Sequence, residues 1–176
     1  MIVASADLSN SDKTDGFLKK TTAFKRGDFS GRFFQAGVSE FTMACVMNGM
    51  ALHGGVIPAC GTFFVFSDYM KPVIRLSALM RLHTIFIWSH DSFRVGEDGP
   101  THQPIEQEAQ IRLMEHLHNH QGERSMVVLR PADAEESVAA WKIALEEHRP
   151  VGLIFSRQDI KSLPALATSR LDEAMQ

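Results

Sequence analysis

The stretch TIFIWSHDSFRVGEDGPTHQPIE, residues 84–106, joins a short apolar run to a segment crowded with polar and turn-forming residues. The apolar run at 84–88 predicts a buried strand. The segment that follows, residues 90–106, contains two histidines and four carboxylates among several glycines and prolines. Loops at the carboxyl ends of strands in open α/β sheets often carry the chemistry of the protein. We therefore expect a functional loop directly after this strand.

Other apolar runs alternate with helical patterns along the rest of the chain. Strands are predicted at residues 2–4, 32–36, 56–59, 84–88, 125–129 and 151–155. Segments of helical periodicity separate most of these runs, as expected for strands joined by crossover helices. The sequence thus predicts an α/β fold, with a mostly parallel, doubly wound sheet and helices on both faces.

The predicted helices differ in their patterns. Residues 40–53 are apolar on nearly every side, which predicts a buried helix. A second helix follows Asp68, with Pro72 in its first turn. Residues 105–117 form a third, and Asp133 with Glu136 has the spacing of a capping box that opens a fourth. The residues expected to share one face are Val73, Leu76, Ser77 and Met80 in the second helix, and Val138, Trp141 and Leu145 in the fourth.

Composition excludes several classes of protein. The chain has 176 residues, 44% of them hydrophobic and 22% charged, which fits one globular domain and neither a disordered nor a membrane-spanning chain. A net charge of −3 gives no sign of a nucleic-acid surface. The first residues lack the pattern of a signal peptide, and Cys45 and Cys60 lie in apolar surroundings. We expect buried, reduced thiols and a cytoplasmic protein.

Five separated segments resemble the central, pyrimidine-binding domain of the transketolase family of thiamine-diphosphate enzymes. They are SADL at 5–8 with Ser11, GVSEFTM at 37–43, GTFFVFSDY at 61–69, residues 90–106, and SRQ at 156–158. The resemblance implies a thiamine-diphosphate-binding fold of the pyrimidine type over residues 1–160. Residues 161–176 lose the alternating pattern and are expected to be a C-terminal linker or the truncated start of the next segment. The sequence departs from the family at Phe93 and Arg94, where a small aliphatic residue and glycine are commoner. This pair is expected to narrow the substrate channel or to change sugar preference.

The resemblance also implies a cofactor and partners. The cofactor is thiamine diphosphate, and in the family Mg²⁺ or Ca²⁺ is bound with its diphosphate by a preceding domain that carries a Gly-Asp-Gly motif. Residues 27–29, Gly-Asp-Phe, are the only similar stretch in this sequence, and they lack the pattern of that motif. The expected partners are phosphosugar substrates, the missing diphosphate-binding and C-terminal domains or a partner subunit, and a second copy in a homodimer. Neither nucleic acid nor membrane is an expected partner.

Five residues are predicted to meet the cofactor or stand next to it. Glu40 matches the family glutamate that hydrogen-bonds the aminopyrimidine ring and so promotes loss of the thiazolium proton. From the residues alone, an exposed first-turn Glu favoured by the helix dipole is an alternative. Phe63, Phe66 and Tyr69 match positions that enclose the flat pyrimidine, although such spacing also suits core aromatics. Asp7 matches a residue near the cofactor at the subunit interface.

Five residues are predicted to meet the substrate. By resemblance, His90 and Asp98 line the substrate channel, where Asp98 recognises a sugar hydroxyl and His90 helps to hold a phosphate. His102 matches a residue near the reacting carbonyl and is a predicted catalytic residue. Ser11 and Arg157 match further phosphate contacts, and a guanidinium suits phosphate because it donates in a planar fork. A metal site at His90, Asp98 and His102 is the rival interpretation, but their spacing fits no standard ligand motif.

Two functions from different classes follow. The chain is predicted to be the pyrimidine-binding domain of a transketolase, whose intact form transfers a two-carbon ketol unit between phosphosugars. The isolated chain is expected to be inactive. The alternative is a non-catalytic assembly or binding domain derived from a thiamine-diphosphate enzyme. The motif GEDGPTHQP at 96–104 favours transketolase over other thiamine enzymes such as the deoxyxylulose-phosphate synthase class.

Overall fold

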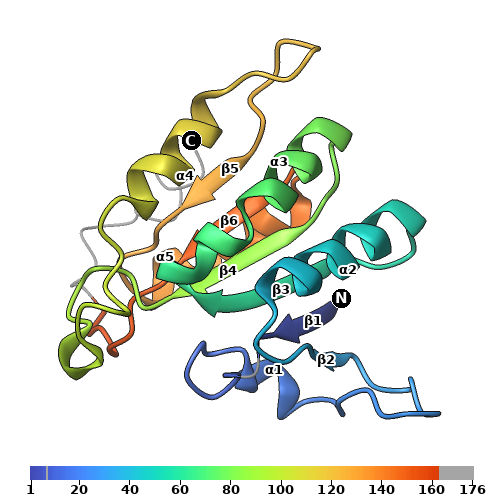
Figure 1. Ribbon diagram of the computed structural model, residues 1–176, viewed down its shortest axis with the longest axis horizontal. Coiled ribbons are helices and arrows are strands. Elements are labelled where there is room, and N and C mark those ends of the chain that lie inside the picture. The colour runs from blue at the N-terminus through green and yellow to red at the C-terminus, as the bar shows by residue number, and fades with distance from the viewer. Residues whose placement is uncertain (7, 163–176) are drawn as a thin grey trace.

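One parallel sheet organises the computed structural model, which describes residues 1–6 and 8–162. In that part of the chain the sheet has six strands in the order β2-β1-β3-β4-β6-β5, and every neighbouring pair is parallel (Figure 1). The strands are β1 (Ile2–Ser5), β2 (Phe33–Gln35), β3 (Pro58–Phe63), β4 (Ile85–Ser89), β5 (Val127–Leu129) and β6 (Val151–Ile154). The predicted α/β class is confirmed, and each of the six predicted strands overlaps an observed one.

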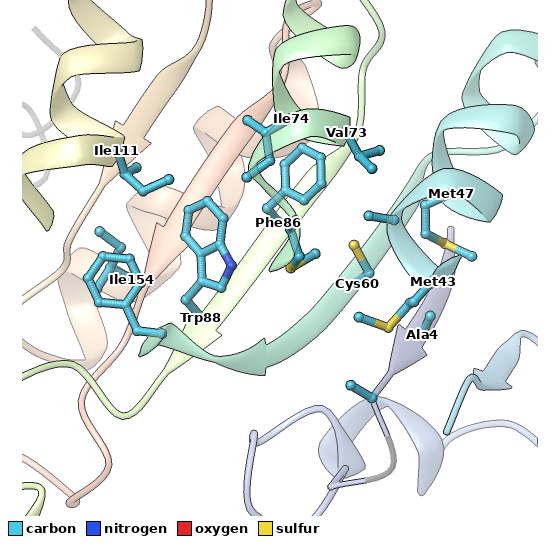
Figure 2. Close-up of a cluster of buried hydrophobic side chains, with 14 of the residues drawn as sticks. Ala4, Met43, Met47, Cys60, Val73, Ile74, Phe86, Trp88, Ile111 and Ile154 are labelled. Carbon is cyan, nitrogen blue, oxygen red and sulfur yellow. The ribbon is translucent and has the colours of Figure 1, made fainter. Parts of the chain in front are cut away.

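Helices cover both faces of the sheet, as predicted. On one face lie α2 (Glu40–His53), α3 (Lys71–Met80) and α4 (Gln107–His116), while α5 (Ala134–Glu146) and the single turn α1 (Asp15–Leu18) pack on the other (Figure 1). Successive strand residues point to opposite faces, so each strand feeds two cores. In β4, Phe86 and Trp88 point toward α3 and α4 (Figure 2). Ile85 and Ile87 belong to the cluster on the other face, with Ala140 and Ala144 of α5.

The helix α2 is not buried on all sides, contrary to the sequence-based expectation. Met43 is fully buried against the sheet, but Phe41 is 51% exposed and Leu52 is 67% exposed. A helix packed on the outside of a sheet buries only one face, so α2 carries more apolar surface than this chain covers.

The prediction of two buried cysteines is only half correct. Cys60 in β3 is buried, whereas Cys45 on the outer side of α2 is exposed.

The apolar faces predicted for α3 and α5 are only partly buried. In α3, Val73 is buried but Leu76 is 47% exposed, because Ile74 and Ala78 turn toward the core instead. In α5 the buried positions are small alanines, which let the helix approach the sheet closely, and Val138 stays exposed. The predicted start of α5 is confirmed, since the Asp133 carboxylate accepts the backbone N–H of Glu136 at 3.0 Å.

Two features complete the description. A 3₁₀ helix, η1 (Phe64–Tyr69), follows β3 directly, and a second one, η2 (Gly96–Asp98), lies in the loop after β4. No helix in residues 1–6 and 8–162 is long and apolar enough to span a membrane.

Candidate active site

The predicted site residues gather at the carboxyl-terminal edge of the sheet. Because all strands are parallel, their carboxyl ends share this edge, which is where open α/β sheets bind ligands. Phe63 ends β3, His90 follows β4, and Arg157 lies just beyond β6. Glu40 is the first residue of α2, the helix that follows β2. Four segments far apart in the sequence therefore contribute to one region.

Glu40 is buried at the wall of a hollow. Glu40 is only 8% exposed, and Thr62 Oγ1 donates a hydrogen bond to Glu40 Oε1 at 3.2 Å. The hollow has a volume of about 380 Å³. It is lined by Ala6, Leu8, Val38, Glu40, Phe66 and Tyr69. Burial excludes the alternative of a solvent-exposed first-turn glutamate.

The aromatic residues spaced by three form a stacked column. The Phe63 and Phe66 rings lie 6.0 Å apart at an interplanar angle of 15°, and the Phe66 and Tyr69 rings lie 6.0 Å apart at 21°. A 3₁₀ helix has three residues per turn, so side chains at i and i+3 eclipse one another. At the base of this column Phe63 is only 6% exposed, whereas Tyr69 at its other end is 60% exposed. Only the base of the column is core, and its outer end faces the hollow.

His90 lies beneath this column. Its ring stacks on Phe63 with centroids 3.7 Å apart, and its Nδ1 is 2.9 Å from Ser89 Oγ. His90 is 3% exposed and adopts a left-handed backbone, with φ of 59°. Burial lowers its pKa to about 4, although the charge of Asp98, whose Oδ2 is 3.5 Å from Nε2, acts in the opposite direction. His90 is therefore a neutral, buried ring at neutral pH.

Two carboxylates form ion pairs with Arg157, the predicted phosphate-binding arginine. Arg157 Nε lies 2.7 Å from Asp98 Oδ2, and an outer guanidinium nitrogen lies 2.6 Å from Glu97 Oε1. Hydrogen bonding to Glu97, with the charges of both carboxylates, raises the pKa of Arg157. Asp98 and Arg157 were predicted from the sequence as site residues, whereas Glu97 was not, although it lies inside the 96–104 motif.

His102 joins the same cluster from the loop after β4. Its ring meets Phe63 edge-on at 5.7 Å and Phe66 edge-on at 5.6 Å, and Thr101 Oγ1 lies 2.8 Å from His102 Nδ1. Phe63 therefore contacts both predicted substrate-binding histidines, His90 and His102. No group of three or more His, Cys, Asp or Glu side chains among the described residues is arranged to hold a metal ion.

Ser11 is half-buried in the loop after β1, and the buried carboxylate of Asp12 links this loop to the sheet. Asp12 accepts hydrogen bonds from Ser5 Oγ at 2.5 Å and from the amide and hydroxyl of Thr14 at 3.0 and 2.7 Å. Burial raises the pKa of Asp12 despite these hydrogen bonds. A Cβ on Gly61 of β3 would lie 2.5 Å from Thr14 Cγ2, so the loop packs on a bare backbone. No local sequence pattern marked Asp12.

Asp91 and Arg94, two further charged residues of the 90–106 loop, have structural partners. Asp91 is buried, and its Oδ2 accepts two hydrogen bonds from Arg130, at 2.7 and 3.0 Å. The Arg94 guanidinium lies 5.0 Å from the centre of the Phe93 ring, which is 45% exposed. The predicted cofactor neighbour Asp7 and residues 163–176 of the predicted linker lie outside the described residues.

Comparison with known proteins agrees with this arrangement. Residues 1–162 match the family model "Transketolase, pyrimidine binding domain". The chain belongs to the transketolase pyrimidine-binding domain family. It is 52% identical over 160 residues to a transketolase of Halalkalibacterium halodurans and 49% identical over 164 residues to one of Geobacillus stearothermophilus. These matches cover 90% and 93% of this chain but only 22% and 23% of the relatives.

Solved structures of transketolases share the fold of this domain. The Campylobacter jejuni transketolase superposes with a TM-score of 0.83 at 39% identity, over 97% of this chain and 24% of that one. A structure described as "Split gene transketolase, inactive beta4 tetramer" matches with a TM-score of 0.68 at 31% identity, over 95% of this chain and 48% of that one. The transketolase pyrimidine-binding domain is thus a part of larger chains in these relatives.

Proposed function

We propose that the chain binds the aminopyrimidine ring of thiamine diphosphate and supplies one half of a transketolase active site. In the intact assembly, that site transfers a two-carbon ketol unit between phosphosugars. The observation that carries the proposal is the 380 Å³ hollow, which pairs the buried carboxyl of Glu40 with the aromatic faces of Phe66 and Tyr69. A flat, polar heteroaromatic ring needs both features, an apolar slot and one placed hydrogen-bonding group.

The residues of the hollow fit the proposed ring. Thr62 donates a hydrogen bond to Oε1 of Glu40, so we assign Oε2 to the hydrogen bond with the ring nitrogen of the pyrimidine. Phe66 and Tyr69 supply a flat contact at small entropic cost, because each aromatic side chain has only two rotatable bonds. The bound cofactor would supply an electron sink for the transferred two-carbon group.

We assign the substrate to the region above His90. We assign His102 to hold or move a proton at the reacting oxygen of the sugar, and Asp98 to accept a hydrogen bond from a sugar hydroxyl. Arg157 and Ser11 are assigned to the substrate phosphate. His90 is neutral and packed against Phe63, which supports a role as a hydrogen-bonding wall of the site and not as a positive charge.

The proposed partners complete the site. The relatives are several times longer than this chain, which supports diphosphate-binding and C-terminal domains in the same chain or in a partner subunit. We assign Mg²⁺ or Ca²⁺ to the diphosphate-binding domain, and we propose a homodimer that works in the cytoplasm in the pentose phosphate pathway. Residues 1–160 are the proposed domain, and 161–176 the proposed linker.

A non-catalytic assembly domain is the second candidate function. The exposed apolar side chains of Phe41 and Leu52 on α2 favour association with another surface. The split-gene relative is described as an inactive tetramer, which supports a subunit that assembles without catalysing.

One reconstitution separates the two functions. The chain is mixed with a separately expressed diphosphate-binding region of the Geobacillus stearothermophilus transketolase, together with thiamine diphosphate and Mg²⁺, and ketol transfer is assayed. We expect activity only in the mixture. Binding without activity in the mixture would support the assembly function, and turnover by the chain alone would contradict the proposal that it forms half a site. A Glu40→Gln chain is the matched inactive control.

A further inference from the structure

Lys13 lies on the rim of two hollows beside the proposed active site. One has a volume of about 470 Å³ and is walled by apolar side chains that include Phe17 and Trp141. The other has a volume of about 270 Å³ and contains Arg157. Lys13 thus shares a surface depression with the proposed phosphate-binding arginine, and it is two residues beyond Ser11.

The two cations differ in how much of their charge is already paired. Arg157 is held by the carboxylates of Glu97 and Asp98 at 2.6 and 2.7 Å. Lys13 is exposed and forms no ion pair with another residue of the described ranges, 1–6 and 8–162. The nearby Asp15 is paired with Lys19 at 2.6 Å. Unlike the charge of Arg157, the charge of Lys13 therefore remains available to an incoming anion.

Two further observations support a functional role for Lys13. Its backbone is left-handed, with φ of 68°, a conformation that costs energy for a residue with a Cβ and that often occurs at functional positions. The charge of Lys13 also reaches His90. Burial is the main cause of the lowered pKa of His90, and the charges of Arg157 and Lys13 lower it further.

We propose that Lys13 is a specificity-determining residue that binds the phosphate of the phosphosugar substrate together with Arg157. This inference rests on the proposed function of the site. An incoming phosphate would replace Glu97 as the partner of the Arg157 guanidinium and would meet the free ammonium of Lys13. Asp133 and Asp159 also line this hollow.

Phosphate binding is tested on the 176-residue chain by NMR. Inorganic phosphate, ribose 5-phosphate and ribose are titrated separately while the backbone amides and the His90 ring are followed. Lys13→Asn removes the charge and keeps a residue type that tolerates a left-handed backbone. Lys13→Arg keeps the charge. Lys25→Asn, at an exposed lysine of the same segment between β1 and β2, is the matched control.

The expected result is weakened phosphate binding in one variant only. Lys13→Asn should raise the dissociation constants of phosphate and ribose 5-phosphate about threefold to tenfold, as expected for one partly solvated charge contact, while Lys13→Arg and Lys25→Asn resemble wild type. Bound phosphate should raise the pKa of His90, which faces Asp98, Arg157, Lys13 and His102. Ribose should cause neither change.

Three results would overturn the inference. They are equal binding by wild type and Lys13→Asn, equal weakening by Lys25→Asn, and the absence of phosphate-induced shifts near Ser11, Lys13 and His90. Anion binding is measured without cofactor or turnover. Failure of the reconstituted ketol-transfer assay with phosphate binding intact would therefore reject the proposed function and leave the role of Lys13 in anion binding standing.

Discussion

Arg157 Nε lies 2.7 Å from Asp98 Oδ2, so an ion pair joins the loop after β6 to the loop after β4. The same Asp98 oxygen lies 3.5 Å from the ring of His90. Arg157, which is assigned to the substrate phosphate, thus also positions Asp98, which is assigned to the sugar. A substitution at Arg157 therefore affects both ends of the substrate site.

Arg157→Ala in the reconstituted enzyme should raise KM for phosphorylated acceptors about tenfold to a hundredfold, because a lost charge-assisted hydrogen bond is worth about 1.5–3 kcal/mol. KM for unphosphorylated acceptors should change much less, and steady-state assays with both acceptor types measure the difference. The control Glu97→Gln frees one side of the guanidinium and keeps the cation, so KM should not rise. Equal losses on both acceptor types would show that Arg157 only positions Asp98.

Glu40→Gln should leave the fold intact and slow proton–deuterium exchange at the thiazolium carbon by about 10²–10⁴-fold in the reconstituted enzyme, the usual contribution of a positioned acid or base. The amide keeps the hydrogen bond from Thr62 but cannot exchange a proton with the ring. Exchange is followed by NMR after quenching with acid. Glu135→Gln, a first-turn glutamate of α5, serves as the control, and an unchanged rate in Glu40→Gln would refute the assignment.

Acid should destabilise the domain through His90. Its pKa is about 4 in the folded state against 6.5 ordinarily, so between these values the unfolded chain binds a proton that the folded chain does not. Stability should therefore fall as pH drops from about 6.5 to 4, by roughly 2–3 kcal/mol from this residue. Urea unfolding across this range measures the slope. His90→Asn, which tolerates the left-handed backbone, should show a shallower slope, and identical slopes would contradict the burial of a neutral ring.

Gly61→Ala should destabilise the domain by about 1–3 kcal/mol, because the added Cβ overlaps Thr14 and forces the Ser11 loop off the sheet. Gly49→Ala is the matched control. It lies within α2 with no atom inside 4 Å of the added Cβ, and alanine there should stabilise by about 0.5–1 kcal/mol. Denaturant midpoints report both changes. A Gly61→Ala midpoint equal to wild type would show that the loop yields without cost.

The sequence predicted the sheet well because local patterns encode it. Each strand is a short apolar run, and the turns around it are rich in glycine, proline and polar residues, so all six strands were located. The family motifs then placed Glu40 and the aromatic residues, and their three-residue spacing became a stacked column only because η1 is a 3₁₀ helix. That helix type was not predicted, since its residues also suit an α-helix or a strand end.

Contacts between distant segments were the features that sequence analysis missed. Nothing near Glu97 indicates that its partner is Arg157, which lies in a different loop. The buried network around Asp12 depends on the bare backbone of Gly61 two strands away in the sequence. The exposed side of α2 was missed for another reason. Apolar content predicts burial, but it does not say whether the covering surface belongs to the same chain.

The interior position of β1 has a consequence for how the domain folds. Val3 pairs with Phe33 on one side and with Ala59 on the other, so this strand lacks both neighbours until later segments of the domain have been synthesised. Parallel pairing between segments distant in sequence closes large loops, and domains dominated by such contacts fold slowly. The rate at which a newly made copy becomes competent to assemble should therefore be set by the synthesis and docking of β3, and not by the formation of its helices.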